Sequence, residues 1–232
     1  MTRCIVNVAT GFYVPLQRRL SSSLDAAGWR QGRVLWTDRL PPGSPPHAEA
    51  PYAFKLHAIR AAFAAGHRSV LWLDAPCIVT RALTPVFEAI ERDGHLLVSS
   101  GGRLGNWASD GCLSAHGLTR DAAMAVELMN GALIGLDLAN ARASRWFEEL
   151  WLACEQGLFA GAYLTEHAPP AVRARKPGKP AGFVSPDPRC WGHGHDESAG
   201  SCLAHRLGLP LTVPGPLFSA RAASGVIEYA RG

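Results

Sequence analysis

The sequence of 232 residues predicts a single α/β domain spanning 1–232, with a mostly parallel central sheet and helices on both faces. Short apolar, β-branched runs alternate with helix-length amphipathic segments, which is the pattern of parallel strands joined by crossover helices. The length lies in the usual range for one such domain. Hydrophobic residues make up 47% of the chain and charged residues 18%, a balance that excludes a disordered chain.

Strand and helix patterns alternate through the first half of the chain. The expected elements are, in order, a strand over 4–9, a helix over 14–24, a strand over 33–36, a helix over 52–65 and a strand over 69–73. The loop PPGSPPHAEAP, before the second helix, contains prolines that exclude regular structure. The strand SVLWL is apolar or small throughout, and it places Asp74 at its carboxyl end.

The second half continues the alternation less regularly. The expected elements are a helix over 84–92, a strand over 95–99, a glycine-rich loop at 101–105, a helix over 120–127, a strand over 132–136, helices over 141–156 and 196–207, and a final strand near Tyr229. The segment 157–189 is basic and rich in proline and glycine. A segment of that length with no expected helix or strand is more often a lid or a binding loop than a simple connection.

The topology predicts one ligand-binding crevice. In open parallel sheets, ligands bind beyond the carboxyl ends of the strands. We therefore expect Thr10, Asp38, Asp74 and the loop after Ser99 to lie close together.

The charge of the chain indicates a mildly basic protein. The formal net charge is +4 at pH 7, and basic residues gather at 173–179. That group suits a phosphate-bearing ligand, or it is an ordinary solvated loop. It falls short of a nucleic-acid-binding signature, although a polyanionic acceptor such as DNA stays open.

Several sequence features concern location and redox state. The six cysteines have no CxxC spacing, which predicts buried thiols in a reducing compartment and neither a zinc module nor a disulfide scaffold. No apolar run approaches the roughly 20 residues of a membrane-spanning helix. The first residues lack the pattern of a signal peptide. We expect a cytoplasmic protein, and the sequence leaves its oligomeric state open.

The segment YAFKLHAIRAAFAAGHRSVLWLDAPCIVTRALTPVFEAI resembles the centre of GT-A glycosyltransferases, in which a helix with a basic residue precedes a buried strand ending in an Asp-Xaa-Asp motif. Two later segments are also similar to that family. NGALIGLDL resembles its strand of donor-sugar and acceptor contacts, and GHGHDESAGSCLAHRLGL resembles its "HDQS" type of helix start. The resemblance runs from about Cys4 to Leu209. It implies a GT-A-like, Rossmann-like fold that transfers a sugar from a nucleotide-diphosphate sugar donor to a hydroxyl of an acceptor glycan or small molecule.

The metal-binding motif of that family is incomplete in this chain. Asp74 matches the first aspartate, but Pro76 stands where the second is expected. The resemblance implies Mn²⁺ or Mg²⁺ on the two carboxylates, where the ion neutralises the donor diphosphate. With Pro76 in place, Asp74 would hold the ion without its usual partner, or a cation such as Lys55 would replace it. A lysine near a helix start is disfavoured unless it meets an anion, so Lys55 is a candidate diphosphate contact, with a solvated surface lysine as the alternative.

Further donor contacts follow from the resemblance. Thr10, Gly11 and Tyr13 come after the first strand, where the family binds the nucleotide base and ribose. Gly11 allows close backbone approach, and Tyr13 can stack on a base. The alternative is an ordinary strand-to-helix turn. Asn130 and Gly131 precede the strand over 132–136 in a comparable position.

The segment WGHGHDES is the richest polar cluster of the sequence. We expect Asp196 to accept the proton of the acceptor hydroxyl or to hold sugar hydroxyls, with His195 as a second catalytic residue and His193 beside the donor or a metal ion. The structural alternative is that Asp196 caps the helix. Two other functions stay open: a metal-dependent hydrolase that uses His193, His195 and Asp196, and a non-catalytic nucleotide- or glycan-binding module, for which Pro76 is the main argument.

Overall fold

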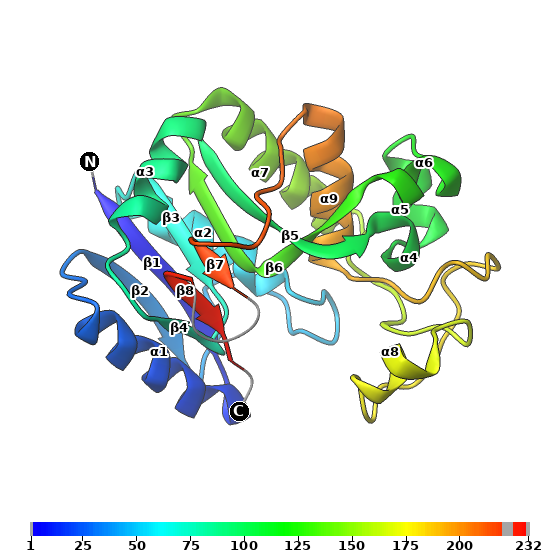
Figure 1. The fold of residues 1–232 in the computed structure, drawn as a ribbon, viewed down its shortest axis with the longest axis horizontal. Coiled ribbons are helices and arrows are strands. Elements are labelled where there is room, and N and C mark those ends of the chain that lie inside the picture. Colours follow the sequence, from blue (N-terminus) through cyan, green and yellow to red (C-terminus); the bar gives the residue numbers. More distant parts are fainter. Residues whose placement is uncertain (1, 220–224, 231–232) are drawn as a thin grey trace.

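The computed structural model describes residues 2–219 and 225–230 (Figure 1). Its strands are β1 (Arg3–Ala9), β2 (Gly32–Thr37), β3 (Ser69–Leu73), β4 (Cys77–Val79), β5 (His95–Arg103), β6 (Glu127–Asp137), β7 (Phe218–Ser219) and β8 (Ile227–Tyr229). Its helices are the 3-10 turn η1 (Gly11–Tyr13), α1 (Val14–Ala26), α2 (Ala53–Ala64), α3 (Thr84–Asp93), α4 (Leu104–Trp107), α5 (Asp110–Ala115), α6 (Arg120–Ala125), α7 (Ala141–Glu155), α8 (Pro170–Ala174) and α9 (Asp196–Leu207). Every strand and helix predicted from the sequence is present, although some of their ends differ.

The central sheet has five strands in the order β2-β1-β3-β6-β5. β1 is parallel to both β2 and β3, whereas β6 is antiparallel to its neighbours β3 and β5. Four strands therefore run in one direction, which confirms the prediction of a mostly parallel sheet. The predicted final strand is β8, and it belongs to a separate sheet with the order β4-β8-β7.

Helices cover both faces of the central sheet, as predicted (Figure 1). On one face, α2, α7 and α9 pack around Trp72 and Trp146, and on the other face, α1 and α3 pack around Leu71 and Phe87. β3 contributes to both cores because successive side chains of a strand point to opposite faces. All five of its residues are buried, which explains its uniformly apolar or small sequence.

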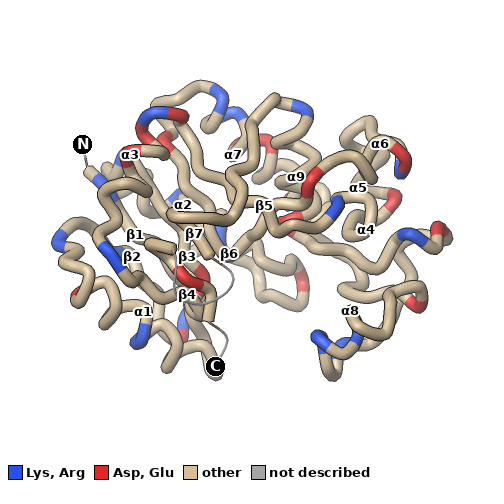
Figure 2. The backbone as a smooth tube through the Cα atoms, in the orientation of Figure 1, with Lys and Arg blue, Asp and Glu red and all other residues tan. Residues whose placement is uncertain are grey.

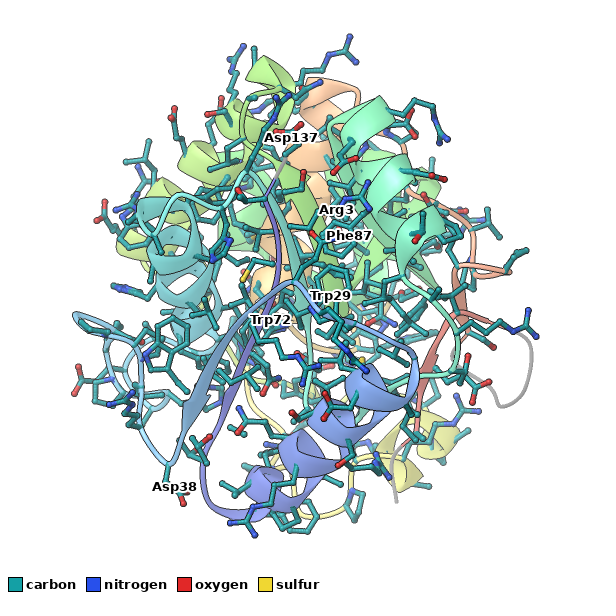
Figure 3. The ribbon with its side chains drawn as sticks, turned by 90° about the vertical axis from the view of Figure 1, so that its left-hand side faces the viewer. Arg3, Trp29, Asp38, Trp72, Phe87 and Asp137 are labelled. Atoms are coloured by element: carbon teal, nitrogen blue, oxygen red, sulfur yellow. The ribbon has the colours of Figure 1, made fainter. Side chains whose placement is uncertain are left out.

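The carboxyl ends of β1, β2 and β3 lie at one edge of the sheet. Asp38 follows β2 at this edge, and Asp137, the last residue of the antiparallel β6, lies at the opposite edge (Figure 3). β6 enters the sheet from the edge of Asp38, so that Leu133 pairs with Leu73 and the amide of Asp74 donates to the carbonyl of Ala132 at 2.9 Å. This pairing places Asp74 beside the start of β6.

The predicted loop at 101–105 is wrong. β5 continues to Arg103, which pairs with Glu127 of β6 after two register shifts, and α4 begins at Leu104. The ladder of hydrogen bonds with β6 outweighs the preference of glycine for loops. Gly101, with a φ of 76°, lies at one of the irregular positions, where glycine adopts the backbone conformation without a penalty.

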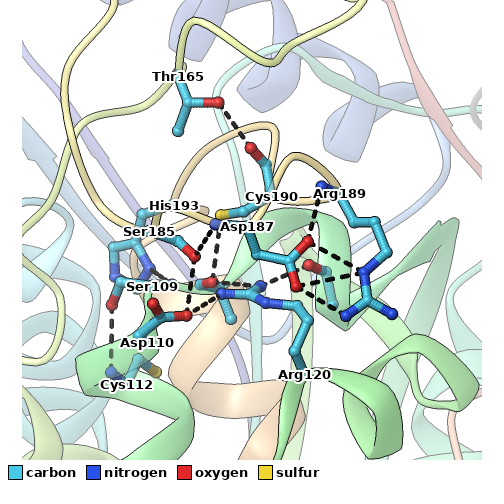
Figure 4. A network of polar contacts seen from close by, with 12 residues as sticks. Ser109, Asp110, Cys112, Arg120, Thr165, Ser185, Asp187, Arg189, Cys190 and His193 are labelled. Carbon is cyan, nitrogen blue, oxygen red and sulfur yellow. Dashed lines mark hydrogen bonds and ion pairs between the residues drawn. The ribbon is translucent and has the colours of Figure 1, made fainter.

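The segment 157–189 lies far from α1 in the molecule and contains the short helix α8 and an isolated bridge between Leu164 and Ala181 (Figure 1). Lysines and arginines gather at and after α8 (Figure 2). A polar network holds the carboxyl end of the segment (Figure 4): Ser185 donates to Asp110 of α5 at 2.9 Å, and Arg189 donates to Asp121 of α6 at 2.7 Å. The carboxyl end of the segment is therefore held by α5 and α6, and the role of the segment as a lid stays a prediction.

The cysteines are free thiols, and five of the six are buried, in agreement with the sequence. Among the described residues, no helix combines the length and the hydrophobicity that crossing a bilayer requires. The extent of the domain, 1–232, stays a prediction.

Candidate functional site

Lys55 connects three elements of the fold at the carboxyl edge of the sheet. Its side chain leaves the first turn of α2, and only 3% of the residue is exposed. The ammonium donates to Asp196 Oδ2 at 2.8 Å and to the carbonyl of Gly131 at 2.9 Å, and it lies 3.6 Å from Asp74 Oδ1. Asp74 and Asp196 therefore meet across one lysine at the edge of the sheet where the topology predicts a ligand site. Neither Thr10 nor Asp38 lines the adjoining pocket, so the predicted crevice is found only in part.

Asp74 is fixed by its own strand. The indole Nε1 of Trp72 donates to Asp74 Oδ1 at 2.8 Å, and the two side chains share a face of the sheet because they are two residues apart. A quarter of the Asp74 side chain, 25%, stays exposed. This carboxylate is oriented by the protein and still accessible to a ligand.

Asp196 and Glu197 open α9, where the helix dipole favours negative charge. The turn before them is strained, since His195 adopts φ 56° and ψ −115°, a conformation rare outside glycine. Glu197 Oε1 accepts a hydrogen bond from the amide of Gly131 at 2.9 Å. A Cβ atom on Gly131 would lie 2.9 Å from Asp196 Oδ2 and 3.0 Å from the Lys55 nitrogen, so only glycine lets β6 approach this closely.

Asp74 and Asp196 pair with the ammonium of Lys55, and Glu197 lies within its electrostatic influence. Burial alone would lower the pKa of Lys55, but Asp196 and Asp74 together raise it, so the lysine is charged. Burial raises the pKa of Asp196, against the attraction of Lys55. Burial and the neighbouring Asp196 raise the pKa of Glu197 to about 7. Burial therefore brings the pKa of Glu197 close to neutral pH.

A pocket of about 180 Å³ opens beside this cluster. Its lining includes Asn130 from β6, Tyr52 before α2, and Tyr163 and Lys176 from the segment 157–189. The volume is below the roughly 300 Å³ at which sites for drug-sized ligands begin, so the pocket suits a ligand moiety about the size of one sugar ring. A larger pocket of about 400 Å³ between α2 and α7 contains none of the clustered charges, and we place the site at the smaller one.

His195 is positioned next to the pocket lining. Its ring centroid lies 5.4 Å from that of Tyr52 and 5.7 Å from that of Tyr163. Nδ1 donates to the carbonyl of Phe159 at 2.7 Å, so that Nε2 carries the lone pair in the neutral ring. Burial lowers the pKa of His195. A neutral imidazole is therefore held rigidly beside Asp196, and its catalytic role stays a prediction.

His193 has a structural position. Its Nε2 donates to the carbonyl of Leu158 at 2.9 Å, and its Nδ1 accepts from the amide of Ser109 at 3.2 Å. Burial lowers its pKa to about 4. Because both ring nitrogens are engaged within the protein, this geometry does not support the predicted contact of His193 with the donor or with a metal ion.

Thr10, Gly11 and Tyr13 lie on an exposed turn after β1. The amide of Gly11 donates to Asp38 Oδ1 at 3.0 Å, which brings together the ends of β1 and β2 as the topology predicts. None of these residues lines the pocket at Lys55. Their assignment to the nucleotide stays a prediction.

The residues around Asp74 do not fit a divalent cation. Mg²⁺ and Mn²⁺ need several oxygen ligands around one point, but the Lys55 ammonium occupies the space between Asp74 and Asp196. Among residues 2–219 and 225–230, neither the acidic cluster nor His193, His195 and Asp196 forms a group of three with ligand atoms within 4.8 Å of one another. This geometry favours Lys55 in place of an ion, one of the two arrangements that Pro76 predicts, and the choice between them stays a prediction.

Sequence reasoning missed Glu197 and Tyr52 as site residues. In the sequence, Glu197 looks like any acidic residue in the first turn of a helix. Its contact with Gly131 depends on the packing of α9 against β6. Tyr52 has the signal of a residue before a helix, and its φ of 64° turns its ring toward the ammonium of Lys55, 4.8 Å away. Neither contact is encoded in local spacing.

No protein-family model and no curated protein matches the chain. Solved structures with a similar fold include mouse xyloside xylosyltransferase 1, with a TM-score of 0.46, 10% identity and coverage of 99% of this chain and 97% of that one. A glycosyltransferase involved in glycosylation of the major capsid of PBCV-1 has a TM-score of 0.43 and 12% identity, covering 68% of this chain and 70% of that one. An active-site mutant of LgtC has a TM-score of 0.38 and 13% identity, covering 100% of this chain and 88% of that one.

Proposed function

We propose that the protein transfers a sugar from a nucleotide-diphosphate sugar to a hydroxyl group of a glycan or small-molecule acceptor. The observation that carries the proposal is the meeting of Asp74 and Asp196 across Lys55, at the carboxyl edge of the sheet and beside a sugar-sized pocket. Ligands of such sheets bind at this edge.

The chemistry of the pocket suits a sugar. Asp74, Asp196 and Glu197 offer carboxyl oxygens that accept hydrogen bonds from sugar hydroxyls. Tyr52 and Tyr163 supply aromatic surface with a polar end, which suits the mixed apolar and polar faces of a sugar ring. Lys55 and Lys176 supply the positive charge that a departing diphosphate needs, in the place where the family has a metal ion.

In this proposal, the neighbouring carboxyl groups of Asp196 and Glu197 have different roles. Asp196, which is held by Lys55, positions the reacting hydroxyl. Glu197, with its pKa raised to about 7, accepts the proton of that hydroxyl as the new glycosidic bond forms. A group with a pKa near the working pH combines a usable fraction of the ionised form with adequate basicity.

The experiment is calorimetric titration of the protein with UDP, GDP, CDP and dTDP, each with and without Mn²⁺. The proposal expects one nucleotide to bind, with an affinity that does not depend on Mn²⁺, since Lys55 takes the place of the ion. The matched variants are Lys55→Met, which should weaken binding, and Arg92→Met, which changes an arginine whose side chain is 70% exposed and should have no effect. Absence of binding by all four nucleotides would contradict the proposal.

A non-catalytic binding module is the second candidate, and the incomplete motif at Pro76 favours it. It predicts the same nucleotide binding as the transferase. The two functions differ in turnover: the module would bind a nucleotide sugar and return it intact after prolonged incubation.

A further inference from the structure

Three metal-binding side chains meet in a part of the molecule that the proposed function does not use. Cys112 and His116 are four residues apart, in α5 and at its carboxyl end, so they face the same side. Cys202 comes from the second turn of α9. One ligand atom from each of the three residues lies within 4.8 Å of the other two. The ligands of a tetrahedral zinc ion stand roughly 3.5 Å apart, so small side-chain rotations bring all three to bonding distance.

The surroundings of these side chains favour a metal ion over a set of unrelated core residues. Cys112 is 1% exposed and Cys202 is 0% exposed, whereas His116 is partly exposed and gives an ion a route to the site. The Nε2 atom of His116 is buried and has no hydrogen-bond partner. A buried nitrogen without a partner costs free energy, and coordination to a metal ion would remove that cost.

We propose that Cys112, His116 and Cys202 bind one thiophilic divalent metal ion, with Zn²⁺ as the best fit. Thiolate and imidazole ligands are the set that zinc prefers, and three protein ligands leave a fourth position for water. Binding releases the two thiol protons to solvent, and the two thiolates neutralise the double positive charge of the ion. The buried site therefore carries no net charge.

The ion would connect α5 to α9. Cys202 lies six residues after Asp196 in the same helix, so a bound metal fixes the helix that begins with Asp196 and Glu197. The proposed metal site does not depend on the function proposed for the pocket.

The test uses Co²⁺ as a spectroscopic probe of the full chain, after treatment with a chelator and a reductant. The expected result is one Co²⁺ per chain, with thiolate-to-cobalt charge-transfer absorption and the visible bands of a tetrahedral ion, and displacement of Co²⁺ by Zn²⁺. Cys112→Ser, Cys202→Ser and His116→Phe should each weaken binding by more than the roughly 10–100-fold typical of outer-shell changes. His116→Cys should retain binding, because it replaces one ligand with another.

Cys4→Ser is the matched control, because Cys4 is a buried thiol outside the group of three ligands. This variant should bind Co²⁺ as the original chain does. A second measurement needs no variant: Zn²⁺ should raise the unfolding midpoint of the original chain, because a ligand of the native state stabilises it. The proposal is overturned if the reduced chain binds Co²⁺ no more tightly than Cys112→Ser does, if Zn²⁺ leaves the midpoint unchanged, or if Cys112 and Cys202 form a disulfide that persists in the reductant.

Discussion

The ammonium of Lys55 lies 2.8 Å from Asp196 Oδ2, and the two residues are 3% and 4% exposed. A buried ion pair of this kind contributes little net stability relative to apolar residues of the same shape, but removal of one partner leaves an uncompensated charge. The pair therefore makes the site sensitive to change at either residue.

Replacement of Lys55 tests this dependence. We expect Lys55→Met to lower the free energy of unfolding by about 3–5 kcal/mol, because Asp196 and Asp74 lose the ammonium that lies 2.8 Å and 3.6 Å from their carboxylates. Urea denaturation followed by circular dichroism measures the loss. The double variant Lys55→Met/Asp196→Leu should recover a large part of it, and Arg92→Met, at an exposed ion pair, should change stability by less than about 1 kcal/mol. A Lys55→Met variant as stable as the original chain would contradict the described geometry.

The raised pKa of Glu197 predicts a pH dependence of stability. Its pKa is about 7 in the folded protein and near 4.3 in the unfolded chain, so between these values the folded state binds the extra proton. The contribution of Glu197 to stability is therefore present at low pH and is lost as the pH rises from about 4.3 to about 7, by up to roughly 4 kcal/mol.

Urea denaturation at several pH values, compared between the original chain and Glu197→Gln, measures this contribution. The comparison is needed because buried histidines such as His193, with lowered pKa values, change stability in the opposite direction over part of this range. Glu127→Gln, at an exposed position, is the control and should keep the original pH profile. Identical pH profiles for the original chain and Glu197→Gln would show that Glu197 titrates normally.

Gly131 tests the close approach of β6 to the site. We expect Gly131→Ala to destabilise the protein by about 1–3 kcal/mol and to impair the site, since the new Cβ atom would lie 2.9 Å from Asp196 Oδ2. The control is Gly111→Ala in α5, where no atom lies within 4 Å of the added Cβ and alanine favours the helix. Thermal unfolding of both variants separates the effects. Equal midpoints would mean that β6 has room for a side chain at this position.

Asp74 and Asp196 should differ in their effects on a ligand. We expect Asp74→Ala to weaken donor binding at least tenfold, or by about 1.4 kcal/mol, because its carboxylate is accessible from the pocket. Asp196→Ala should abolish transfer and leave nucleotide affinity nearly unchanged, because its role concerns the reacting hydroxyl. Calorimetry gives the first quantity and a turnover assay the second. Full activity in both variants would refute the assignment of the site.

The sheet and the meeting of Asp74 with Asp196 could be predicted from the sequence. SVLWL is a buried strand by composition alone, and the residue after a parallel strand lies at the edge where ligands bind. The helix beginning at Asp196 has local signals, namely two glycines followed by acidic residues. Topology and local signals together were sufficient to bring these two distant carboxylates to one place.

The remaining features depend on tertiary packing that local patterns do not encode. The course of β5 beyond Ser99 is set by its pairing with β6, which overrides the glycines of that segment. The pKa of Glu197 is raised because the packing of α9 buries its carboxyl group next to Asp196. Cys112 and Cys202 are too far apart in sequence for their spacing to indicate a site, and they meet because α5 packs against α9.

Turnover of a nucleotide sugar tests the central claim most directly. The original chain, Asp196→Asn and Glu197→Gln are incubated with UDP-, GDP-, CDP- and dTDP-linked sugars, and the nucleoside diphosphate that is released is quantified by chromatography. The proposed function predicts release from at least one donor by the original chain, and a large reduction in both variants. Recovery of every donor intact, or release at the same rate by all three proteins, would contradict it.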